Sequence, residues 1–595
     1  MWRVMKEVIG KKRISANQFH KKIILNNCEI TNNSLISNSF NHAFVNTGPS
    51  LSLKVKKSKT SFESYLTSNN YLMENNELSE QELFDAVNLL KSNKGNGVDD
   101  VSSNIIIKSI YHIKIPLLHI FSLSLEQGIF PDKLKVARVI PVLKSGDATC
   151  VTNYRPISIL PCFSKILEHI MYKRLYHFLD INNILYSKQF GFKNGHSTDQ
   201  AIAHLVHDIL KSFDENKYTL GVFIDLSKAF DTVNHYILLT KLKNYGVKHS
   251  NFKWFKSYLS NRQQYISHNC GKTNNMNITC GVPQGSILGP LLFLIYINDL
   301  SKSCSVLDSI LFADDTNLFY AHNDIRILFK TVNIELQYLA EWFRANKLSL
   351  NLTKTKYTFF HRYHERDKIP LKLPNLCINN YEIKREVSLN FLGVLLDENV
   401  AWRAHIKYIE GKISRNIGLL YRAKPFLNPS CLKLLYFSFI HSYLNYANIA
   451  WCSTNKNKLK KLFNMQKHAI RIISNERRYT PSQPLFINLN ILNIYQINIY
   501  HILIFMFKIN KSIIPKIFNP LFKINENKYL TRYSNNRYIQ PKSYFAATEF
   551  SISIRGPKAW NKILPTELKA LTMLNEFKSK LRQLLLKNDL PQNYF

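Results

Sequence analysis

Two adjacent acids, Asp314 and Asp315, lie between two apolar runs within residues 310–320. Such runs are typical of strands, and the acids fall where a tight hairpin would turn. Two crowded carboxylates repel each other, and one stays protonated unless a cation neutralises the pair. Magnesium favours hard oxygen ligands of this kind. Taken alone, the pair is better explained as a solvated turn, because Asp-Asp pairs are common in loops.

Asp225 supplies a third acid, directly after the apolar residues 220–224. This run predicts a buried strand that ends near Asp225. Burying a lone carboxylate costs free energy, so a partner or a metal must compensate. Asp225 could instead cap a helix, or be neutralised in the core by Lys228. Its combination with Asp314 and Asp315 makes a metal site the stronger interpretation.

A turn rich in glycine and proline lies between these acids in the sequence, at residues 281–290. Gly281 and Gly285 flank Pro283 and Gln284, so the backbone here can approach a ligand closely. An apolar helix follows to about residue 299, and its N-terminus could hold a phosphate or a base. A lone turn of this composition would be unremarkable, and its position between two acidic strands is what favours a functional role.

These groups together could perform nucleotidyl transfer. Two metal ions ~3.5–4 Å apart can activate a 3′-hydroxyl and stabilise the leaving pyrophosphate. Because the transition state of phosphoryl transfer is loose, positioning and charge neutralisation carry most of the catalysis. Upstream of the acids, Lys144 and Arg155 are placed to offset the charge of a triphosphate.

Helices and strands must alternate to position these residues, so the fold class is expected to be α/β or α+β. Ser79 and Glu82 have the spacing of a capping box, which predicts a helix to residue 91. A second helix over 103–127 should stop at Gly128. Further strands are expected at 136–144 and 356–361, a hairpin at 391–397, and helices at 160–180, 199–213, 403–424, 430–449, 456–474 and 490–515.

Composition points to a folded protein with an anionic partner. Of 595 residues, 45% are hydrophobic, and 79 Lys and Arg oppose 41 Asp and Glu, a net charge of +38. Nucleic acid is the commonest partner for such a surplus, and a membrane surface the next. No apolar run reaches the ~20 residues of a spanning helix and no signal peptide is evident, so we expect a nuclear or cytoplasmic protein without a membrane. Nine cysteines without a CxxC pair argue against a zinc knuckle.

Four motifs in order give the chain a resemblance to a known family. From about residue 75 onward it resembles the reverse transcriptases of non-LTR (LINE-type) retrotransposons of the jockey group. Each motif is moderately specific, and all four in this order are very specific. They are Asn153-Tyr154-Arg155-Pro156-Ile157-Ser158, Phe223-Ile224-Asp225-Leu226-Ser227-Lys228-Ala229-Phe230-Asp231, Gly281-Val282-Pro283-Gln284-Gly285-Ser286 and Phe312-Ala313-Asp314-Asp315.

The resemblance implies a right-hand polymerase that copies an RNA template onto a DNA primer from deoxynucleoside triphosphates. It implies two Mg²⁺ ions, with Mn²⁺ as a possible substitute, held by Asp225, Asp314 and Asp315. Oligomeric state is left open. The expected domains are a polar linker over 1–75, a helical extension of the fingers over 76–124, fingers and palm over 125–397, a helical thumb over 398–480 and a C-terminal helical region over 481–595.

Further roles are implied by the same resemblance. Phe230 is expected to be the aromatic gate that occupies the space of a ribose 2′-hydroxyl, although core packing is an alternative. Gln284 and Gly285 are expected to contact the incoming nucleotide, and Arg155 and Lys144 its phosphates. Lys354, in an Asn-x-x-Lys-Thr pattern, could protonate pyrophosphate, or it could be a surface lysine.

Departures from the family pattern bear on function. Complete elements of this group carry an endonuclease ahead of the polymerase, whereas residues 2–12 resemble only the connector between the two domains. We therefore expect a truncated copy that lacks the endonuclease. The alternatives to an active polymerase are a catalytically silent RNA-binding remnant and a polymerase adopted by its host.

Overall fold

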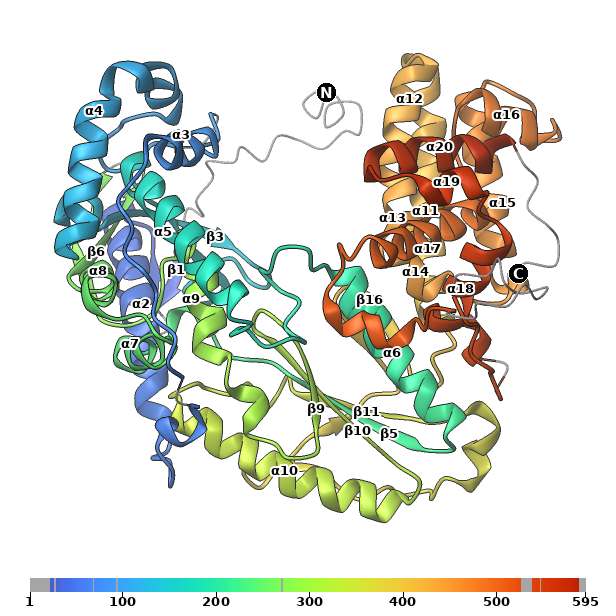
Figure 1. Cartoon of the computed structure of the whole chain (residues 1–595), viewed down its shortest axis with the longest axis horizontal. Helices are drawn as coiled ribbons and strands as arrows, with labels where there is room; N and C mark the ends of the chain where they lie inside the picture. The colour runs from blue at the N-terminus through green and yellow to red at the C-terminus, as the bar shows by residue number, and fades with distance from the viewer. Residues whose placement is uncertain are drawn as a thin grey trace.

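The computed structural model describes residues 22–587 except 26–27, 68, 93–94, 269–270, 526–537 and 546. Its ribbon has the outline of a U (Figure 1). Most of the N-terminal half, blue to green, forms one arm, and the C-terminal helices, orange to red, form the other. A central sheet joins the two arms at the base. The connector resemblance at residues 2–12 lies outside the described residues.

The central sheet has five strands in the order β14-β11-β5-β10-β9. β5 (Tyr218–Ile224) lies in the middle, antiparallel to both β10 (Asp315–His322) and β11 (Lys356–Phe360). β9 (Asp308–Phe312) forms one edge, antiparallel to β10, and β14 (Lys384–Arg385) forms the other, parallel to β11. The strands predicted on either side of the three acids are therefore confirmed.

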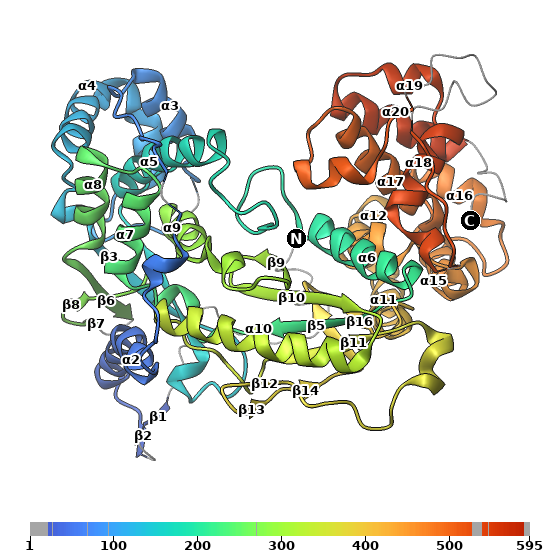
Figure 2. The ribbon, with the colours of Figure 1, turned by 60° about the horizontal axis from the view of Figure 1, so that its bottom comes forward.

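Helices cover both faces of this sheet, and the alternation along β5 explains why. Leu220 and Val222 point to a hydrophobic core shared with α10 (Ile325–Ala345), whereas Phe223 packs on a second core that includes α6 (Thr198–Asp214). Figure 2 shows α10 and α6 on opposite sides of the sheet. Because both faces are buried, β5 reads as a continuous apolar run rather than an alternating one.

A second five-stranded sheet organises the N-terminal arm, in the order β4-β3-β6-β7 with β8 beside β6. Its strands are β3 (Val136–Leu143), β4 (Tyr154–Ile159), β6 (Arg262–His268), β7 (Gly271–Lys272) and β8 (Met276–Ile278). The helices of this arm are α3 (Glu80–Asn88), α4 (Ser103–Gln127), α5 (Cys162–Ile181), α7 (His235–Asn244), α8 (His249–Leu259) and α9 (Leu288–Ile297). The predicted capping box of Ser79 and Glu82 is present, and Gly128 ends α4 with a φ of 70°.

Residues 33–54 differ from the sequence prediction, which is a polar linker over 1–75 with a helix only from residue 40 to Gly48. They form α2 (Asn33–Lys54), preceded by the short strands β1 (Ile23–Leu25) and β2 (Cys28–Ile30). α2 has a weak apolar pattern, but Phe40 is buried on Tyr154 with ring centroids 4.8 Å apart. Asn41 donates to Thr273 Oγ1 at 3.1 Å. Contacts with the second sheet therefore stabilise this helix, whose apolar residues show only a weak helical periodicity.

The C-terminal arm is helical, as predicted, with one difference. A single helix expected over 430–449 is divided into α12 (Pro429–Tyr436), a π-helical turn (Phe437–His441), α13 (Ser442–Asn445) and α14 (Asn448–Trp451). The division before α14 falls at Ala447, which has a φ of 49°. The remaining helices are α11 (Arg403–Ala423), α15 (Lys456–Ile473), α16 (Ser482–Asn488), α17 (Ile494–Asn510), α18 (Ile552–Lys562), α19 (Thr566–Ala570) and α20 (Leu574–Lys587). The predicted hairpin at 391–397 is β15 (Ser388–Phe391) and β16 (Val394–Asp397).

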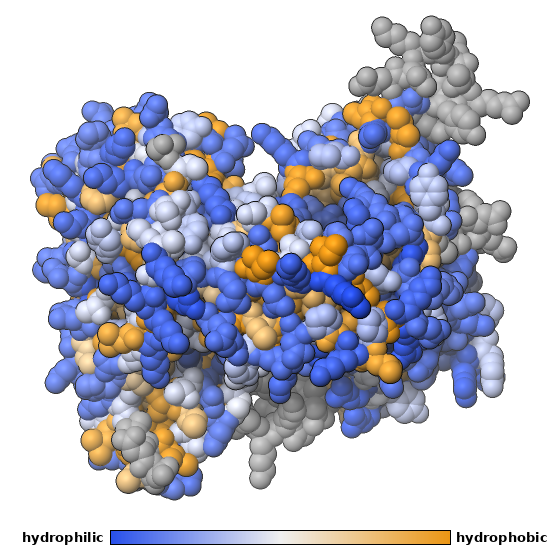
Figure 3. Space-filling view, turned by 90° about the horizontal axis from the view of Figure 1, so that it is seen from below, coloured by the Kyte–Doolittle hydropathy of each residue, from blue (hydrophilic) through white to orange (hydrophobic). Residues whose placement is uncertain are grey.

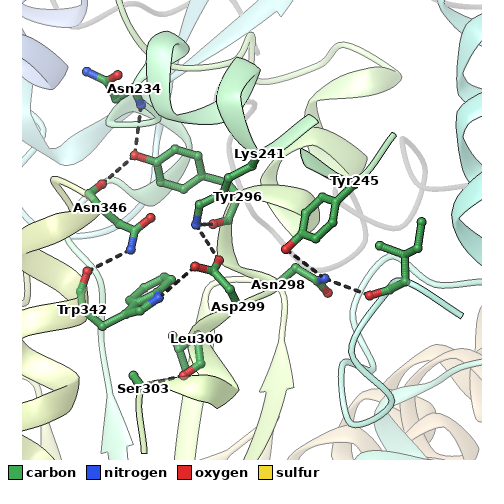
Figure 4. A network of polar contacts seen from close by, with 11 residues as sticks. Asn234, Lys241, Tyr245, Tyr296, Asn298, Asp299, Leu300, Ser303, Trp342 and Asn346 are labelled. Atoms are coloured by element: carbon green, nitrogen blue, oxygen red, sulfur yellow. Dashed lines mark hydrogen bonds and ion pairs between the residues drawn. The ribbon is translucent and has the colours of Figure 1, made fainter. Parts of the chain in front are cut away.

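A buried ion pair joins α7, α9 and α10 beneath the central sheet. Lys241 and Asp299 have no solvent-exposed side-chain surface, and Lys241 Nζ donates both to Asp299 Oδ1 and to the Tyr296 carbonyl oxygen. Trp342 Nε1 donates to the second Asp299 oxygen at 3.2 Å, which completes the network in Figure 4. The two charges neutralise each other, and neutral partners on α9 and α10 complete their hydrogen bonds, so the network ties three helices to one geometry.

We expect Lys241→Met to destabilise the fold by about 3–5 kcal/mol, because it leaves the Asp299 carboxylate buried without a counter-charge. Urea unfolding followed by tryptophan fluorescence measures the change. Adding Asp299→Leu should recover most of the loss, since the double variant buries no charge. An unfolding midpoint for Lys241→Met equal to that of the wild type would contradict this account of the network.

One described helix, α4, meets the length and composition of a membrane-crossing helix, with 22% of its most apolar window buried. This differs from the expectation that no apolar run is long enough to span a membrane. The helix packs Ile106, Phe121 and Leu125 into the core and leaves Ile115 exposed. The face seen from below, which carries α10, is mostly hydrophilic with separated apolar patches (Figure 3).

Candidate functional site

Asp225 follows β5 directly, and a neighbouring loop holds its carboxylate. Asn351 Nδ2 donates to Asp225 Oδ2 at 2.8 Å, and the Asn351 backbone N–H donates to the Asp225 carbonyl at 2.9 Å. Lys228, considered as a neutralising partner, instead donates to the carbonyls of Thr152 and Tyr154. Asp225 is half-buried. Among the described residues, the side-chain partner of this carboxylate is therefore a neutral amide rather than a cation.

Asp314 and Asp315 lie at the tip of the β9–β10 hairpin, as the sequence predicts. Phe312 pairs with Asp315, so Ala313 and Asp314 form the two-residue turn. Ala313 has a φ of 55°, a left-handed conformation that costs an alanine free energy. Asp314 is half-buried and Asp315 is exposed. The turn thus presents two successive carboxylates in a geometry that the surrounding structure must maintain.

Sheet register brings Asp225 beside this turn. Thr316 of β10 pairs with Ile224 of β5, so the next positions along the two strands are Asp315 and Asp225. Desolvation and the neighbouring Asp314 and Asp225 carboxylates raise the pKa of Asp315 to about 6, although its side chain remains accessible to solvent. Three acids from two distant segments therefore share one electrostatic environment.

The donor set suits a hard divalent cation, because it offers several carboxylate oxygens whose mutual repulsion a cation would relieve. Among the residues that the structure describes, no three His, Cys, Asp or Glu side chains stand close enough to form a ready-made metal cage. An ion would therefore have to draw the carboxylates together. The assignment of Asp225, Asp314 and Asp315 as metal ligands stays a prediction.

Removing one charge from this set should stabilise the metal-free protein. We expect Asp315→Asn to raise the free energy of unfolding in EDTA by on the order of 1 kcal/mol, since its exposure weakens the repulsion. Mg²⁺ should then stabilise the wild type more than the variant, because ligand binding adds to the stability of the state that binds it. Thermal melts of both proteins with EDTA and with Mg²⁺ test this. A variant less stable than the wild type in EDTA would refute it.

Four cations gather near the acids. Lys144 and Arg155 are exposed at the end of the β3–β4 hairpin, and Lys354 is exposed after Asn351. Burial lowers the pKa of Lys228, and the positive charges of Lys144, Arg155 and Lys354 lower it further, against an opposing effect of Asp231. A cluster of like charges of this kind favours a polyanionic ligand. Lys144, Arg155 and Lys354 therefore lie near Lys228, and their predicted roles toward a nucleotide stay predictions.

Gln284 and Gly285 lie beside the β4 strand. The Ser158 backbone N–H donates to the Gln284 carbonyl at 2.7 Å, and a Cβ on Gly285 would lie 2.5 Å from the Ser158 carbonyl oxygen. Gly285 has a φ of 125°, so no other residue fits without strain. Gln284 Nε2 donates to Asp231 Oδ1 at 2.8 Å, which orients its side chain. A contact of either residue with a nucleotide stays a prediction.

The expectation that the N-terminus of the following helix holds a phosphate or a base is wrong. Glu168, fully buried on α5, accepts from the backbone N–H groups of Ile287 and Leu288 at 2.7 and 3.4 Å. This carboxylate already satisfies the free donors at the start of α9. The sequence could not indicate it, because Glu168 lies more than a hundred residues earlier.

Phe230 lies in a short 3₁₀ turn between Asp225 and the helix α7. Its ring stacks on Phe293 with centroids 4.6 Å apart, and the edge of Phe192 approaches it at 6.2 Å. The ring is half-buried rather than enclosed in the core. Both alternatives from the sequence therefore have support, since the ring packs on α9 and also keeps an accessible side.

Sequence reasoning missed Asn351, Lys228 and Gln189 as site residues. Asn351 begins the Asn-x-x-Lys-Thr pattern, so the motif itself carried the signal. Lys228 stands within the motif of Asp225, but it was considered only as a counter-charge. Gln189 donates nothing to the acids, yet its side chain accepts from the backbone of the Asp314 turn. Only the tertiary structure brings residue 189 to that turn.

Comparison with known proteins identifies a family match and several relatives. Residues 142–396 match the family described as Reverse transcriptase (RNA-dependent DNA polymerase). The chain is 27% identical over 437 residues to a probable RNA-directed DNA polymerase from transposon BS of Drosophila melanogaster. The matched region covers 69% of this chain and 46% of the relative. It is 28% identical over 368 residues to the RNA-directed DNA polymerase from mobile element jockey of the same species, covering 60% and 39%.

A third relative is the Pol polyprotein from type-1 retrotransposable element R1 of Bradysia coprophila, 28% identical over 58% of this chain and 34% of the relative. The chain thus spans less than half the length of the curated relatives it matches. The resemblance inferred from the four motifs is confirmed.

Proposed function

We propose that this chain, whose residues 142–396 carry a reverse transcriptase domain, is an RNA-directed DNA polymerase of a non-LTR retrotransposon. It extends the 3′-hydroxyl of a DNA primer on an RNA template, using deoxynucleoside triphosphates. The observation that carries the proposal is the register of the central sheet, which sets Asp225 beside the Asp314–Asp315 turn. A net charge of +38 supports a nucleic-acid partner.

Reverse transcriptases generally use divalent metal ions, and Asp225, Asp314 and Asp315 are the residues that would hold them here. Bound ions of this kind activate the primer hydroxyl and neutralise the leaving pyrophosphate. Asn351 fixes one oxygen of Asp225 through its 2.8 Å hydrogen bond, which leaves the other oxygen for coordination. Asp315, with its pKa raised to about 6, is the acid whose ionised form gains most from a cation.

In this proposal the triphosphate is bound by Lys144, Arg155 and Lys354. Lys228 adds a fourth positive charge beside them. Lys228 also ties the β3–β4 hairpin to the acidic motif through the Thr152 and Tyr154 carbonyls. Phe230 lies against the sugar of the incoming nucleotide and excludes a 2′-hydroxyl.

In this proposal the incoming base pair packs against Gln284 and Gly285. Gln284 is held by Asp231, so its backbone rather than a free amide faces the nucleotide.

In this proposal the chain has the parts of a right-hand polymerase. Residues 76–124 extend the fingers, residues 125–397 form the fingers and palm, and residues 398–480 form the thumb, followed by a helical region over 481–595. Two features support these bounds. Both five-stranded sheets are formed by residues before 397, and the chain after residue 397 is mainly helical. α2 adds to the fingers, because it packs on β6 and β8 rather than linking two domains.

Primer extension on poly(rA) with an oligo(dT) primer, Mg²⁺ and dTTP tests the proposal. We expect a ladder of extended primer that disappears in EDTA. Well-folded protein that binds the RNA in a salt-dependent manner but never extends the primer would contradict it and identify a silent RNA-binding remnant.

A further inference from the structure

Residues 186–191 run along the free edge of β9 and act as a sixth, irregular strand of the central sheet. The Phe190 N–H donates to the Leu311 carbonyl at 2.8 Å, and the Leu311 N–H donates to the Lys188 carbonyl at 3.0 Å. Tyr186 reaches the same strand, because its hydroxyl donates to the Ser309 carbonyl at 3.0 Å. The segment therefore follows the strand that leads into the Asp314 turn.

Gln189 continues this contact onto the turn itself. Its Oε1 accepts from the Ala313 N–H at 3.0 Å and from the Gly191 N–H at 2.8 Å. Because both partners are donors, the amide oxygen must face them. The side chain is 3% exposed, and among the described residues its Nε2 has no hydrogen-bond partner. A buried amide with an unsatisfied donor costs free energy. Fold stability alone therefore does not account for a glutamine here.

Gly191 allows the segment to approach so closely. A Cβ at this position would lie 2.3 Å from the Ala313 nitrogen and 2.9 Å from the Phe312 carbonyl carbon. Real Cβ atoms do not tolerate such distances, so any side chain at residue 191 would push the turn away. The short contact and the hydrogen bond act on the same peptide unit, the one that joins Phe312 to Ala313.

The peptide unit concerned is the strained one. Ala313 keeps its φ of 55° because the Gln189 oxygen satisfies its N–H in that orientation. We propose that Gln189, seated by Gly191, is a positioning residue that holds the turn so that the Asp314 carboxylate points toward Asp225 and Asp315. This inference rests on the proposed function, since it assigns the turn a metal-binding task.

Loss of the acceptor lets the turn relax toward the ordinary φ of alanine and moves Asp314 away from the other two acids. Outer-sphere partners of metal ligands typically contribute about 10–100-fold to metal affinity. We therefore expect Gln189→Met, which keeps length and burial but removes the acceptor, to weaken Mn²⁺ binding about tenfold or more. The expected change in kcat is of similar size, with the Kd for primer-template unchanged.

The experiment compares Gln189→Met with Gln200→Met by electron paramagnetic resonance of free Mn²⁺ during titration of the full chain. Gln200 is a matched control, because it is also buried and accepts from a backbone N–H, at Ser197, away from the turn. Both variants should lose stability, but only Gln189→Met should lose Mn²⁺ affinity. Gly191→Ala is a second variant with the same expected loss, in case Gln189→Met does not fold.

Equal Mn²⁺ affinities for Gln189→Met and Gln200→Met, or wild-type affinity in a folded Gly191→Ala, would overturn the inference. Failure of the proposed function is distinguishable from these results. A wild-type protein that binds Mn²⁺ but extends no primer refutes the polymerase, whereas the difference between the two glutamine variants still decides the role of Gln189.

Discussion

Asp225→Asn should lower the rate of primer extension by about 10³-fold or more, which corresponds to about 4 kcal/mol of transition-state stabilisation. The substitution keeps the shape of the side chain and an oxygen that can accept from Asn351, which lies 2.8 Å from the carboxylate. It removes one of the two neighbouring negative charges that raise the pKa of Asp315. Because catalysis in this proposal requires cations bound between the three acids, we expect Asp225→Asn to lose activity but to keep the fold.

Single-turnover extension by Asp225→Asn, measured beside the wild type, gives this ratio directly. Asp367→Asn serves as the control, because Asp367 is exposed on a distant 3₁₀ turn and should leave the rate unchanged. The affinity of Asp225→Asn for RNA and its dependence on salt should also be unchanged, since phosphate contacts by basic residues set both. A rate within tenfold of the wild type would remove Asp225 from the catalytic site.

Phe230→Val should reduce discrimination against ribonucleotides by about 100-fold, or about 2.7 kcal/mol. The ring packs on Phe293 at 4.6 Å and lies 6.2 Å from the Phe192 ring, and these contacts favour the position in which it would exclude a 2′-hydroxyl. Valine frees that space while keeping an apolar contact with Phe293. Incorporation of dTTP should fall only a few-fold, because the triphosphate contacts lie elsewhere.

The measurement is the ratio of kcat/KM for dTTP and UTP on one primer-template. Phe230→Tyr is the matched control, since it keeps the ring and should keep the ratio near that of the wild type. If Phe230→Val also discriminates as the wild type does, the ring is only part of the core and the gate lies elsewhere.

Local signals in the sequence predicted the elements that they directly control. The Ser79 capping box and Gly128 set the ends of α3 and α4 through interactions within a few residues, and both are present. α2 is different, because its helix depends on Phe40 reaching Tyr154 and Asn41 reaching Thr273. The sequence predicts only the part of this helix from residue 40 to Gly48, because contacts of that range cannot be inferred from periodicity. The divided helix over 430–449 has the same origin, since nothing in its sequence marks Ala447 as left-handed.

The candidate site shows the same limit. The three acids could be predicted, because each lies beside an apolar strand and their side chains carry the chemistry. Among their supporting residues, Asn351 stands in a motif that could have indicated it, but Glu168 and Gln189 could not be predicted, since they make their contacts from segments distant in the sequence. Glu168 is the clearest case, because it occupies a helix terminus that local composition presents as free. Sequence patterns therefore predict which groups react, and tertiary contacts decide which neighbours position them.

Iron-directed cleavage tests the central claim that Asp225, Asp314 and Asp315 share one divalent-cation site. Fe²⁺ replaces Mg²⁺ in the full-length protein, and ascorbate with peroxide then generates hydroxyl radicals that cut the backbone near the bound ion. The account predicts cuts near residue 225 and near residues 314–315 together, both suppressed by excess Mg²⁺ and both absent in Asp225→Asn. Cuts near only one of these segments, or cuts that Mg²⁺ does not suppress, would contradict it.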